Sequence, residues 1–217
     1  MRPERRRPKR LAGRADVARQ PDYTGEETRS KRARQLGYAA RSVFKLEELD
    51  RRFRLLRPGD RVLDLGAAPG SWSQYAAQRI GGNGLLVAVD LQEVGVTFPN
   101  GIVRQCDAFT LDEAAVVEWT DGKAPPFDVV LSDMAPSTTG VGLADHVASV
   151  ELCDHALGLA VRWLRPGGHF VCKVFQGEDE PALRKRIQAV FKKLKGVRPK
   201  GTRSHSREIF LVAQGRR

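Results

Sequence analysis

The chain of 217 residues is long enough to bury one sizeable core, and its 41% of hydrophobic residues excludes a largely disordered protein. No apolar run approaches the length of a membrane-spanning helix, and the charged N-terminus lacks the apolar stretch of a signal peptide. The three cysteines have no paired spacing and no CxxC or His/Cys cluster suggests zinc, which predicts reduced thiols and no metal site. These features predict a cytoplasmic protein.

The net charge of +11 is concentrated at the two ends of the chain. Residues 1–34 hold twelve lysines and arginines against five acids, and residues 184–217 hold twelve against one. The middle, residues 35–183, holds thirteen against twenty. Each basic run alone is compatible with a solvated surface. Two basic ends around a mildly acidic middle, together with the small-molecule site predicted below for that middle, favour a nucleic acid as partner.

Residues 1–28 are rich in Arg, Pro and Gly and predict a disordered basic arm, whereas 29–217 is predicted to form a single domain. A helix is predicted over 29–54, with apolar positions on one side. The predicted strands are 61–65, 85–90, 101–105, 127–132, 169–175, 195–200 and 208–213, and the further predicted helices are 72–80, 111–119, 147–164 and 181–194. This alternation, with early strands that are apolar throughout, predicts an α/β fold with a mostly parallel, doubly wound sheet and helices on both faces.

Residues 62–72, VLDLGAAPGSW, predict a strand that enters a helix through a tight turn. Gly66 and Gly70 leave room for a close approach of the backbone, and Pro69 removes an amide donor that a phosphate would need. Asp90, at the end of the second strand, can accept hydrogen bonds from both ribose hydroxyls of a nucleoside. The GxGxxG spacing of a nicotinamide site is absent, so S-adenosylmethionine, which carries no phosphate, fits better.

Three further positions have a functional and a plain structural interpretation. Asp107 can accept from the adenine amino group or cap a helix that starts near Phe109, and spacing does not separate the two. Lys173 lies in a buried strand, where a lysine is costly unless it meets carboxylates or a cleft; the alternative is a strand-end lysine that reaches solvent. Asp133 follows a strand end, where active sites gather or an aspartate caps a loop.

Five short motifs occur in an order that resembles the FtsJ-type (RlmE-like) ribosomal RNA methyltransferases: FKL at 44–46, DLGAAPGSWSQ at 64–74, SDMAP at 132–136, KVFQG at 173–177 and SRE at 206–208. The resemblance runs from about residue 32 to the C-terminus and leaves out the basic arm. It implies a Rossmann-like, S-adenosylmethionine-dependent enzyme that methylates the ribose 2′-hydroxyl of a uridine in large-subunit (23S) ribosomal RNA.

The resemblance also implies the site residues. Its catalytic set corresponds to Lys45, Asp133, Lys173 and Glu208. Its cofactor contacts correspond to Gly70, Trp72, Asp90, Asp107 and Asp133, to which the glycine turn adds Gly66. Alone, Lys45 and Glu208 would be read as a helix-surface lysine and an edge-strand acid. Ser71 and Cys106 stand where the family often has glycine, and neither change removes a reacting group.

The expected reaction is an in-line displacement in which the ribose hydroxyl loses its proton. We expect a neutral Lys173 to take this proton, with Asp133 and Glu208 orienting it and Lys45 lowering its affinity for a proton. The alternative is that Asp133 takes the proton and Lys173 only positions the hydroxyl.

RNA contacts are expected from the basic residues of 29–54 and 184–200 and from Arg203 and Arg207, in a monomer. The competing functions are a non-catalytic RNA-binding or ribosome-assembly factor, a transfer RNA methyltransferase, and a nicotinamide-dependent oxidoreductase.

Overall fold

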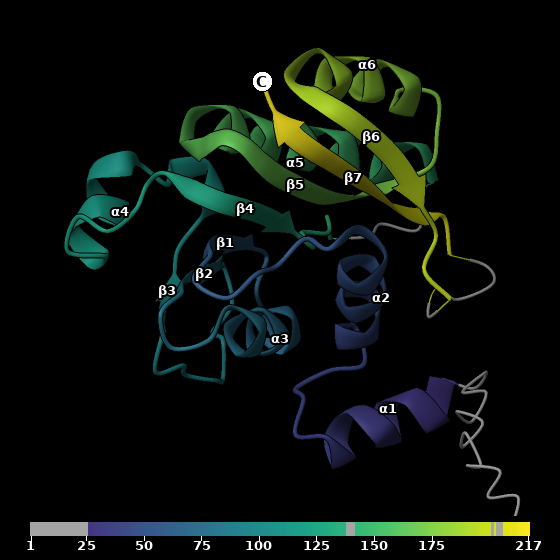
Figure 1. The fold of residues 1–217 in the computed structure, drawn as a ribbon. Helices are drawn as coiled ribbons and strands as arrows, with labels where there is room; N and C mark the ends of the chain where they lie inside the picture. Colours follow the sequence, from purple (N-terminus) through teal and green to yellow (C-terminus); the bar gives the residue numbers. More distant parts are fainter. Residues whose placement is uncertain (1–25, 138–141, 201, 203–205) are drawn as a thin grey trace, which may run out of the picture.

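The computed structural model describes residues 26–137, 142–200, 202 and 206–217, which form one seven-stranded sheet with helices on both faces (Figure 1). The strand order is β3-β2-β1-β4-β5-β7-β6. The strands are β1 (Arg61–Leu65), β2 (Leu85–Asp90), β3 (Gly101–Gln105), β4 (Phe127–Ser132), β5 (Leu164–Phe175), β6 (Phe191–Val197) and β7 (Glu208–Arg216). Strands β1 to β5 pair in parallel, and β7 runs antiparallel to both β5 and β6. The predicted mostly parallel α/β fold is confirmed.

The helices divide between the two faces of the sheet. They are α1 (Glu26–Gln35), α2 (Val43–Phe53), α3 (Ser71–Ile80), α4 (Glu113–Trp119), α5 (Gly142–Trp163) and α6 (Glu180–Val190), with a short 3₁₀ helix, η1 (Ala108–Thr110). Buried side chains of α4, α5 and α6 form one core with one face of the sheet, and those of α2 and α3 form a second core on the other face. We call the latter the α2 face.

The central strands are buried on both sides, as the sequence predicted. The side chains of Val62, Leu63 and Leu65 in β1 are fully buried, and successive residues of a strand point to opposite faces. An uninterrupted apolar run therefore serves both cores at once. The predicted bounds of β1, β2, β3 and β4 are confirmed without change.

The predicted helix over 29–54 is wrong in its middle, because the chain forms two helices, α1 and α2, joined by residues 36–42. Gly37 leaves the helical conformation with a φ of +78°. The Gln74 side chain of α3 then donates to the carbonyl of Gly37 and accepts from the amide of Ala39, at 3.0 and 2.8 Å. These contacts hold the connection on α3 and allow α2 to pack on the sheet. The first three residues of α1, 26–28, had been included in the predicted disordered arm, whose residues 1–25 lie outside the described part of the chain.

The C-terminal elements also differ from the prediction. The helix predicted over 181–194 ends at Val190, and Phe191–Val197 is strand β6 because it pairs with β7 over its whole length. Lysine-rich segments favour helices locally, but cross-strand pairing overrides a weak propensity. Residues 198–200, predicted as strand, lie beyond the end of β6.

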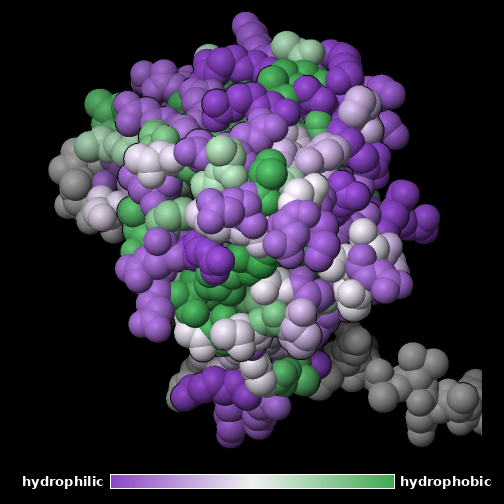
Figure 2. Space-filling model, turned by 90° about the vertical axis from the view of Figure 1, so that its left-hand side faces the viewer, coloured by the Kyte–Doolittle hydropathy of each residue, from purple (hydrophilic) through white to green (hydrophobic). Residues whose placement is uncertain are grey.

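The surface is largely hydrophilic on the side of the molecule that Figure 2 presents, with one larger hydrophobic patch in the lower part of the view and several small ones elsewhere. Among the described residues, no helix combines the length and the apolar character that crossing a bilayer requires.

Asp50 fastens α2 to α3 and to the chain that enters β1. Its carboxylate is 2% exposed and accepts four hydrogen bonds of 2.9–3.0 Å: from the amides of Leu55 and Leu56, the hydroxyl of Tyr75 and the guanidinium of Arg79. Because α2 also carries Lys45, this buried carboxylate sets the position of a predicted catalytic residue.

We predict that Asp50→Ala lowers the free energy of unfolding by roughly 3 kcal/mol, since it leaves buried donors without an acceptor. Urea unfolding measures this change. The matched control is Glu47→Ala on the exposed side of the same helix, for which we expect a change below about 0.5 kcal/mol. Equal effects of the two substitutions would show that Asp50 does not carry this part of the fold.

Candidate active site

Three adjacent strands and one helix bring the four predicted catalytic residues together. Asp133 directly follows β4, Lys173 lies near the end of β5, and Glu208 begins β7. Lys173 stands opposite Phe210 in the β5–β7 pairing, so side-chain alternation places Lys173 and Glu208 on the same face of the sheet. Helix α2 packs on this face and contributes Lys45.

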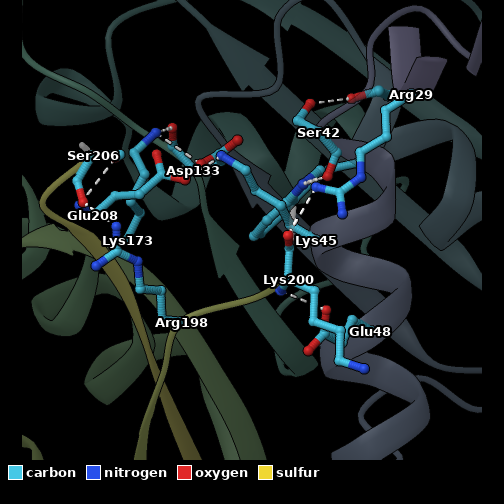
Figure 3. A network of polar contacts seen from close by, with 12 residues as sticks. Arg29, Ser42, Lys45, Glu48, Asp133, Lys173, Arg198, Lys200, Ser206 and Glu208 are labelled. Carbon is cyan, nitrogen blue, oxygen red and sulfur yellow. Dashed lines mark hydrogen bonds and ion pairs between the residues drawn. The ribbon is translucent and has the colours of Figure 1, made fainter. Parts of the chain in front are cut away.

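The four side chains form two ion pairs, which Figure 3 shows side by side. The Lys173 ammonium donates to the Asp133 carboxylate at 2.8 Å and to the Asp133 carbonyl at 2.6 Å, and the Lys45 ammonium donates to the Glu208 carboxylate at 2.5 Å. All four side chains are at most 18% exposed, so solvent screens these pairs weakly. Sequence reasoning expected Glu208 to orient Lys173; its contact is instead with Lys45.

A cavity of about 470 Å³ opens beside Asp133, at the carboxyl ends of β1, β2 and β4. Three aspartates line it, Asp90, Asp107 and Asp133, together with apolar residues such as Leu91 and Phe109. Among the described residues that line it there is no lysine or arginine. An acidic wall with apolar sides fits a nucleoside that carries positive charge and no phosphate.

Two of these aspartates already hold backbone amides. Asp90 accepts from the amides of Ala68 and Gln92 at 2.9 and 2.8 Å, which fixes its carboxylate at the cavity wall. Asp107 accepts from the amide of Phe109 at 2.9 Å and so caps η1. Each carboxylate oxygen can accept a second hydrogen bond, so capping by Asp107 and ligand binding are compatible.

The predicted cofactor residues of the glycine turn lie differently. Gly66 lines the cavity, but a Cβ there would stand 2.8 Å from Met134, and its φ is +76°. At Gly70, with a φ of +111°, a Cβ would stand 2.2 Å from Val96. Both glycines are thus required by close packing within the protein itself. The Trp72 side chain is 2% exposed, and its indole N–H donates to the carbonyl of Ser42 at 3.0 Å, away from the cavity. Only its backbone remains for a ligand, and the cofactor roles of Gly70 and Trp72 stay predictions.

Asp64, at the end of β1, is a buried acid to which the sequence analysis gave no role. Its carboxylate is fully buried, accepts from the Ser73 hydroxyl at 2.6 Å, and leaves Oδ1 without a partner among the described residues. Burial and, to a smaller extent, the negative charges of Asp133 and Asp90 raise the pKa of Asp64 to about 7, against the hydrogen bond from Ser73. A cationic ligand in the cavity would relieve this charge repulsion.

The raised pKa predicts a dependence of stability on pH. The folded state binds this proton more tightly than the unfolded chain, whose pKa is near 3.8. The contribution to stability is therefore complete below that value and is lost as the pH rises towards 7. Between pH 4 and 8, wild type should lose roughly 4 kcal/mol relative to Asp64→Asn, as measured by urea unfolding at each pH. A difference between the two proteins that does not change with pH would contradict the burial of this acid.

One face of α5 holds the end of β5, and the sequence analysis missed it. Strand β4 pairs with β5 only as far as Cys172, and beyond that point three buried side chains of α5 take over the backbone groups of β5. Cys153 donates to the Lys173 carbonyl at 2.9 Å. Ser149 accepts from the Phe175 amide at 3.1 Å, and His146 donates from Nδ1 to the Phe175 carbonyl at 2.8 Å.

These residues recur at positions i, i+3 and i+7 of the helix, which is the spacing of one helical face. We call these three side chains the polar stripe of α5; the sequence shows their spacing on one helical face, but not which strand they meet. The stripe allows β4 to leave the sheet at Asp133 while β5 continues to Lys173 with its backbone groups paired.

We predict that Ser149→Ala lowers kcat about 10- to 100-fold, because a small displacement of a reacting group is enough for such a loss. S-adenosylmethionine affinity, measured by calorimetry, should be unchanged. Thr120→Val is the matched control, since it removes buried hydrogen bonds of a similar kind at the distant turn after α4. If both variants lose activity only in proportion to their lost stability, Ser149 does not position Lys173.

The fold and the site together define a class: an α/β enzyme with an acidic cavity at its strand ends and two lysine–carboxylate pairs, one of which includes Asp133 of the cavity wall. Comparison with known proteins agrees. The model of the FtsJ-like methyltransferase family matches residues 38–216, so the chain belongs to that family. Its members use S-adenosyl-L-methionine. This cofactor carries no phosphate and fits a cavity whose described lining is acidic and holds no lysine or arginine.

Individual relatives cover nearly the whole chain. A protein of Sorangium cellulosum named ribosomal RNA large subunit methyltransferase E is 49% identical over 95% of this chain and 96% of its own length. A protein of the same name from Bdellovibrio bacteriovorus is 46% identical over 88% and 96%. A Plasmodium falciparum crystal structure described as a ribosomal RNA methyltransferase superposes with a TM-score of 0.71 at 25% identity, covering 82% of this chain and 98% of its own.

Proposed function

We propose that this protein transfers a methyl group from S-adenosylmethionine to the ribose 2′-hydroxyl of a uridine in large-subunit (23S) ribosomal RNA. The observation that carries the proposal is the pairing of Lys173 with Asp133, which lines the acidic cavity, together with the pairing of Lys45 with Glu208. The names of the relatives at 46–49% identity support the RNA of the large subunit as substrate.

Separate residues are proposed to bind S-adenosylmethionine and to take the proton. Asp90 would hold the ribose of S-adenosylmethionine, Asp107 its adenine and Asp133 the positively charged end. When bound, S-adenosylmethionine supplies a methyl group on a positively charged sulfur. Two of the three donor directions of Lys173 are used by Asp133, which leaves one direction for the 2′-oxygen of the RNA.

Lys173 is then the group that takes the proton of the hydroxyl, for which it must be neutral when the substrates are bound. Asp133 orients it through both its carboxylate and its carbonyl. Glu208 holds the Lys45 ammonium, which would donate to the same oxygen. Low exposure of the pairs keeps competing water away.

We predict that Lys173→Ala lowers kcat about 10²- to 10⁴-fold and leaves the affinity for S-adenosylmethionine nearly unchanged. Lys173→Arg separates the two interpretations of the proton transfer, because arginine stays charged and cannot accept a proton. Single-turnover assays on unmethylated RNA measure the methyl-transfer rates of the Lys173→Ala and Lys173→Arg variants. Substantial activity of Lys173→Arg would show that Lys173 only positions the hydroxyl and that Asp133 takes the proton.

Asp90→Ala should raise the dissociation constant of S-adenosylmethionine roughly tenfold or more, since a charge-assisted hydrogen bond to a ribose hydroxyl is worth about 1.5–3 kcal/mol. Asp112→Ala, which removes the cap of α4 away from the cavity, is the control. Unchanged affinity of the Asp90 variant in calorimetry would reject the ribose contact.

The proposed function is tested by mapping 2′-O-methyl groups on total RNA from cells with and without this protein. We expect one uridine of the large-subunit RNA to lose its methyl group and to regain it with wild type but not with Lys173→Ala. A methyl group lost from a transfer RNA would reassign the substrate. Rescue of ribosome assembly by Lys173→Ala without methylation would favour a non-catalytic assembly factor.

The basic surface of α1 and α2 and the segment after β6 is the proposed contact with RNA, in a cytoplasmic monomer. Arg29 of α1 donates to the Lys200 carbonyl at 2.9 Å, and the Lys200 amide donates to Glu48 of α2 at 2.9 Å (Figure 3). These contacts hold cationic segments from both ends of the chain together beside Lys45. Arg207 donates to the Gln176 carbonyl, and the predicted contact at Arg203 lies outside the described residues.

A further inference from the structure

The basic residues of 184–200 belong to two different faces of the molecule. On α6, Arg184 pairs with Glu180 at 2.5 Å, and Arg186 pairs with both carboxylate oxygens of Asp154 at 2.8 and 2.6 Å. These arginines are neutralised on the α5 side of the sheet. The α6 part of this basic segment, which sequence reasoning had included in the RNA contact, therefore offers little unpaired charge.

The lysines of β6 lie on the other face. Lys193 and Lys195 stand opposite Gln214 and Val212 of β7, and side-chain alternation puts them on the α2 face, where Val212 is part of the core. Both lysines are exposed, and within the described part of the chain neither takes part in an ion pair. The sequence from 191 to 207 contains no acid that could neutralise them.

These lysines extend the active site along the sheet. Glu208 begins the β7 face that continues through Phe210 and Val212 to Gln214. At ~3.3 Å per residue, Lys195 and Lys193 stand beside positions about 13 and 20 Å from Glu208 along β7.

Helix α2 follows the same direction and adds a further cation. The Gln214 side chain donates to the Phe53 carbonyl at 2.9 Å, and the Arg52 guanidinium lies over the Phe53 ring at 5.1 Å. Arg52 is exposed, as is Lys200 beside α2. We call Arg52, Lys193, Lys195 and Lys200 the β6 cation track.

We propose that the β6 cation track binds the phosphate backbone of the RNA that flanks the target nucleotide, so that the strand leaves the pocket along β6. This inference rests on the proposed function and adds the path of the substrate. A length of 13–20 Å corresponds to about four to six stacked nucleotides at ~3.4 Å each. Phosphate is the partner that a row of unpaired cations fits, since lysine binds it as a point charge.

Lysines on an edge strand also have a plain structural use, because they prevent pairing with the edge of another molecule. The two roles differ in salt dependence. Each phosphate neutralised by a lysine adds about 0.7–0.9 to the slope of log affinity against log salt concentration, whereas edge protection adds nothing to it.

The test uses the full chain with Lys193→Gln and Lys195→Gln together, and unmethylated large-subunit RNA as the probe. The matched control is Lys123→Gln with Lys185→Gln, which removes the same charge from exposed positions away from the α2 face. We expect the track variant to raise the RNA KM roughly tenfold and to lower the salt slope by about 1.4–1.8, while kcat at saturating RNA and the affinity for S-adenosylmethionine stay unchanged. Arg52→Gln alone should lower the slope by about 0.7–0.9.

A salt slope equal to that of wild type in the track variants would overturn the proposal, and self-association of the double variant at an unchanged slope would assign edge protection to these lysines instead. An equal effect of the control variant would show general attraction by net charge and would equally overturn the track. These results leave the proposed function standing as long as wild type methylates the RNA. Absence of wild-type methylation would contradict the proposed function itself.

Discussion

The ion pair between Lys173 and Asp133 is the contact on which the rest of the site depends. It joins the ends of two neighbouring parallel strands at the point where β4 leaves the sheet and β5 continues. The departure of β4 opens the cavity at Asp133 and also leaves one edge of β5 without a strand partner, while β7 stays paired with the other edge as far as Phe175. The polar stripe of α5 supplies the missing hydrogen-bond partners. The end of the β4–β5 pairing therefore both opens the cavity and sets the position of Lys173.

Charge is arranged so that each part of the proposed reaction meets its complement. The cavity is lined by acids and no described cation, which suits a positively charged nucleoside. Asp133 and Glu208 each pair with one lysine, and β6 carries exposed lysines that form no ion pair within the described part of the chain. The surface is thus acidic where S-adenosylmethionine would bind and basic where the RNA would bind, in agreement with the acidic middle and basic ends of the sequence.

The sequence predicted best what depends on short-range pattern. The bounds of four strands were predicted without error. In β1, β2 and β4 burial on both faces leaves a largely apolar run, whereas β3 lies at the edge of the sheet and is only partly buried. The four reacting residues came from motif resemblance; spacing alone would not have paired Lys45 with Glu208 across 163 positions of sequence.

What the sequence did not reveal depends on contacts between distant segments. The break after α1 is held by Gln74 of α3, and β6 replaces a helical pattern because β7 pairs with it. The cofactor role of Trp72 stays a prediction, and the contact of its indole with the Ser42 carbonyl, which links α3 to the start of α2, was not visible in the sequence. The roles of Ser149 and Cys153 follow from where β4 stops, which no local pattern states.

The most direct measurement is a crystal structure of the protein with S-adenosylhomocysteine and an RNA oligonucleotide that contains the target uridine. We expect the ligand in the cavity at Asp90 and Asp133, with the 2′-oxygen about 2.6–3.2 Å from the Lys173 nitrogen and facing the sulfur. A ribose oxygen bound away from the two lysine–carboxylate pairs, or a ligand outside this cavity, would contradict it.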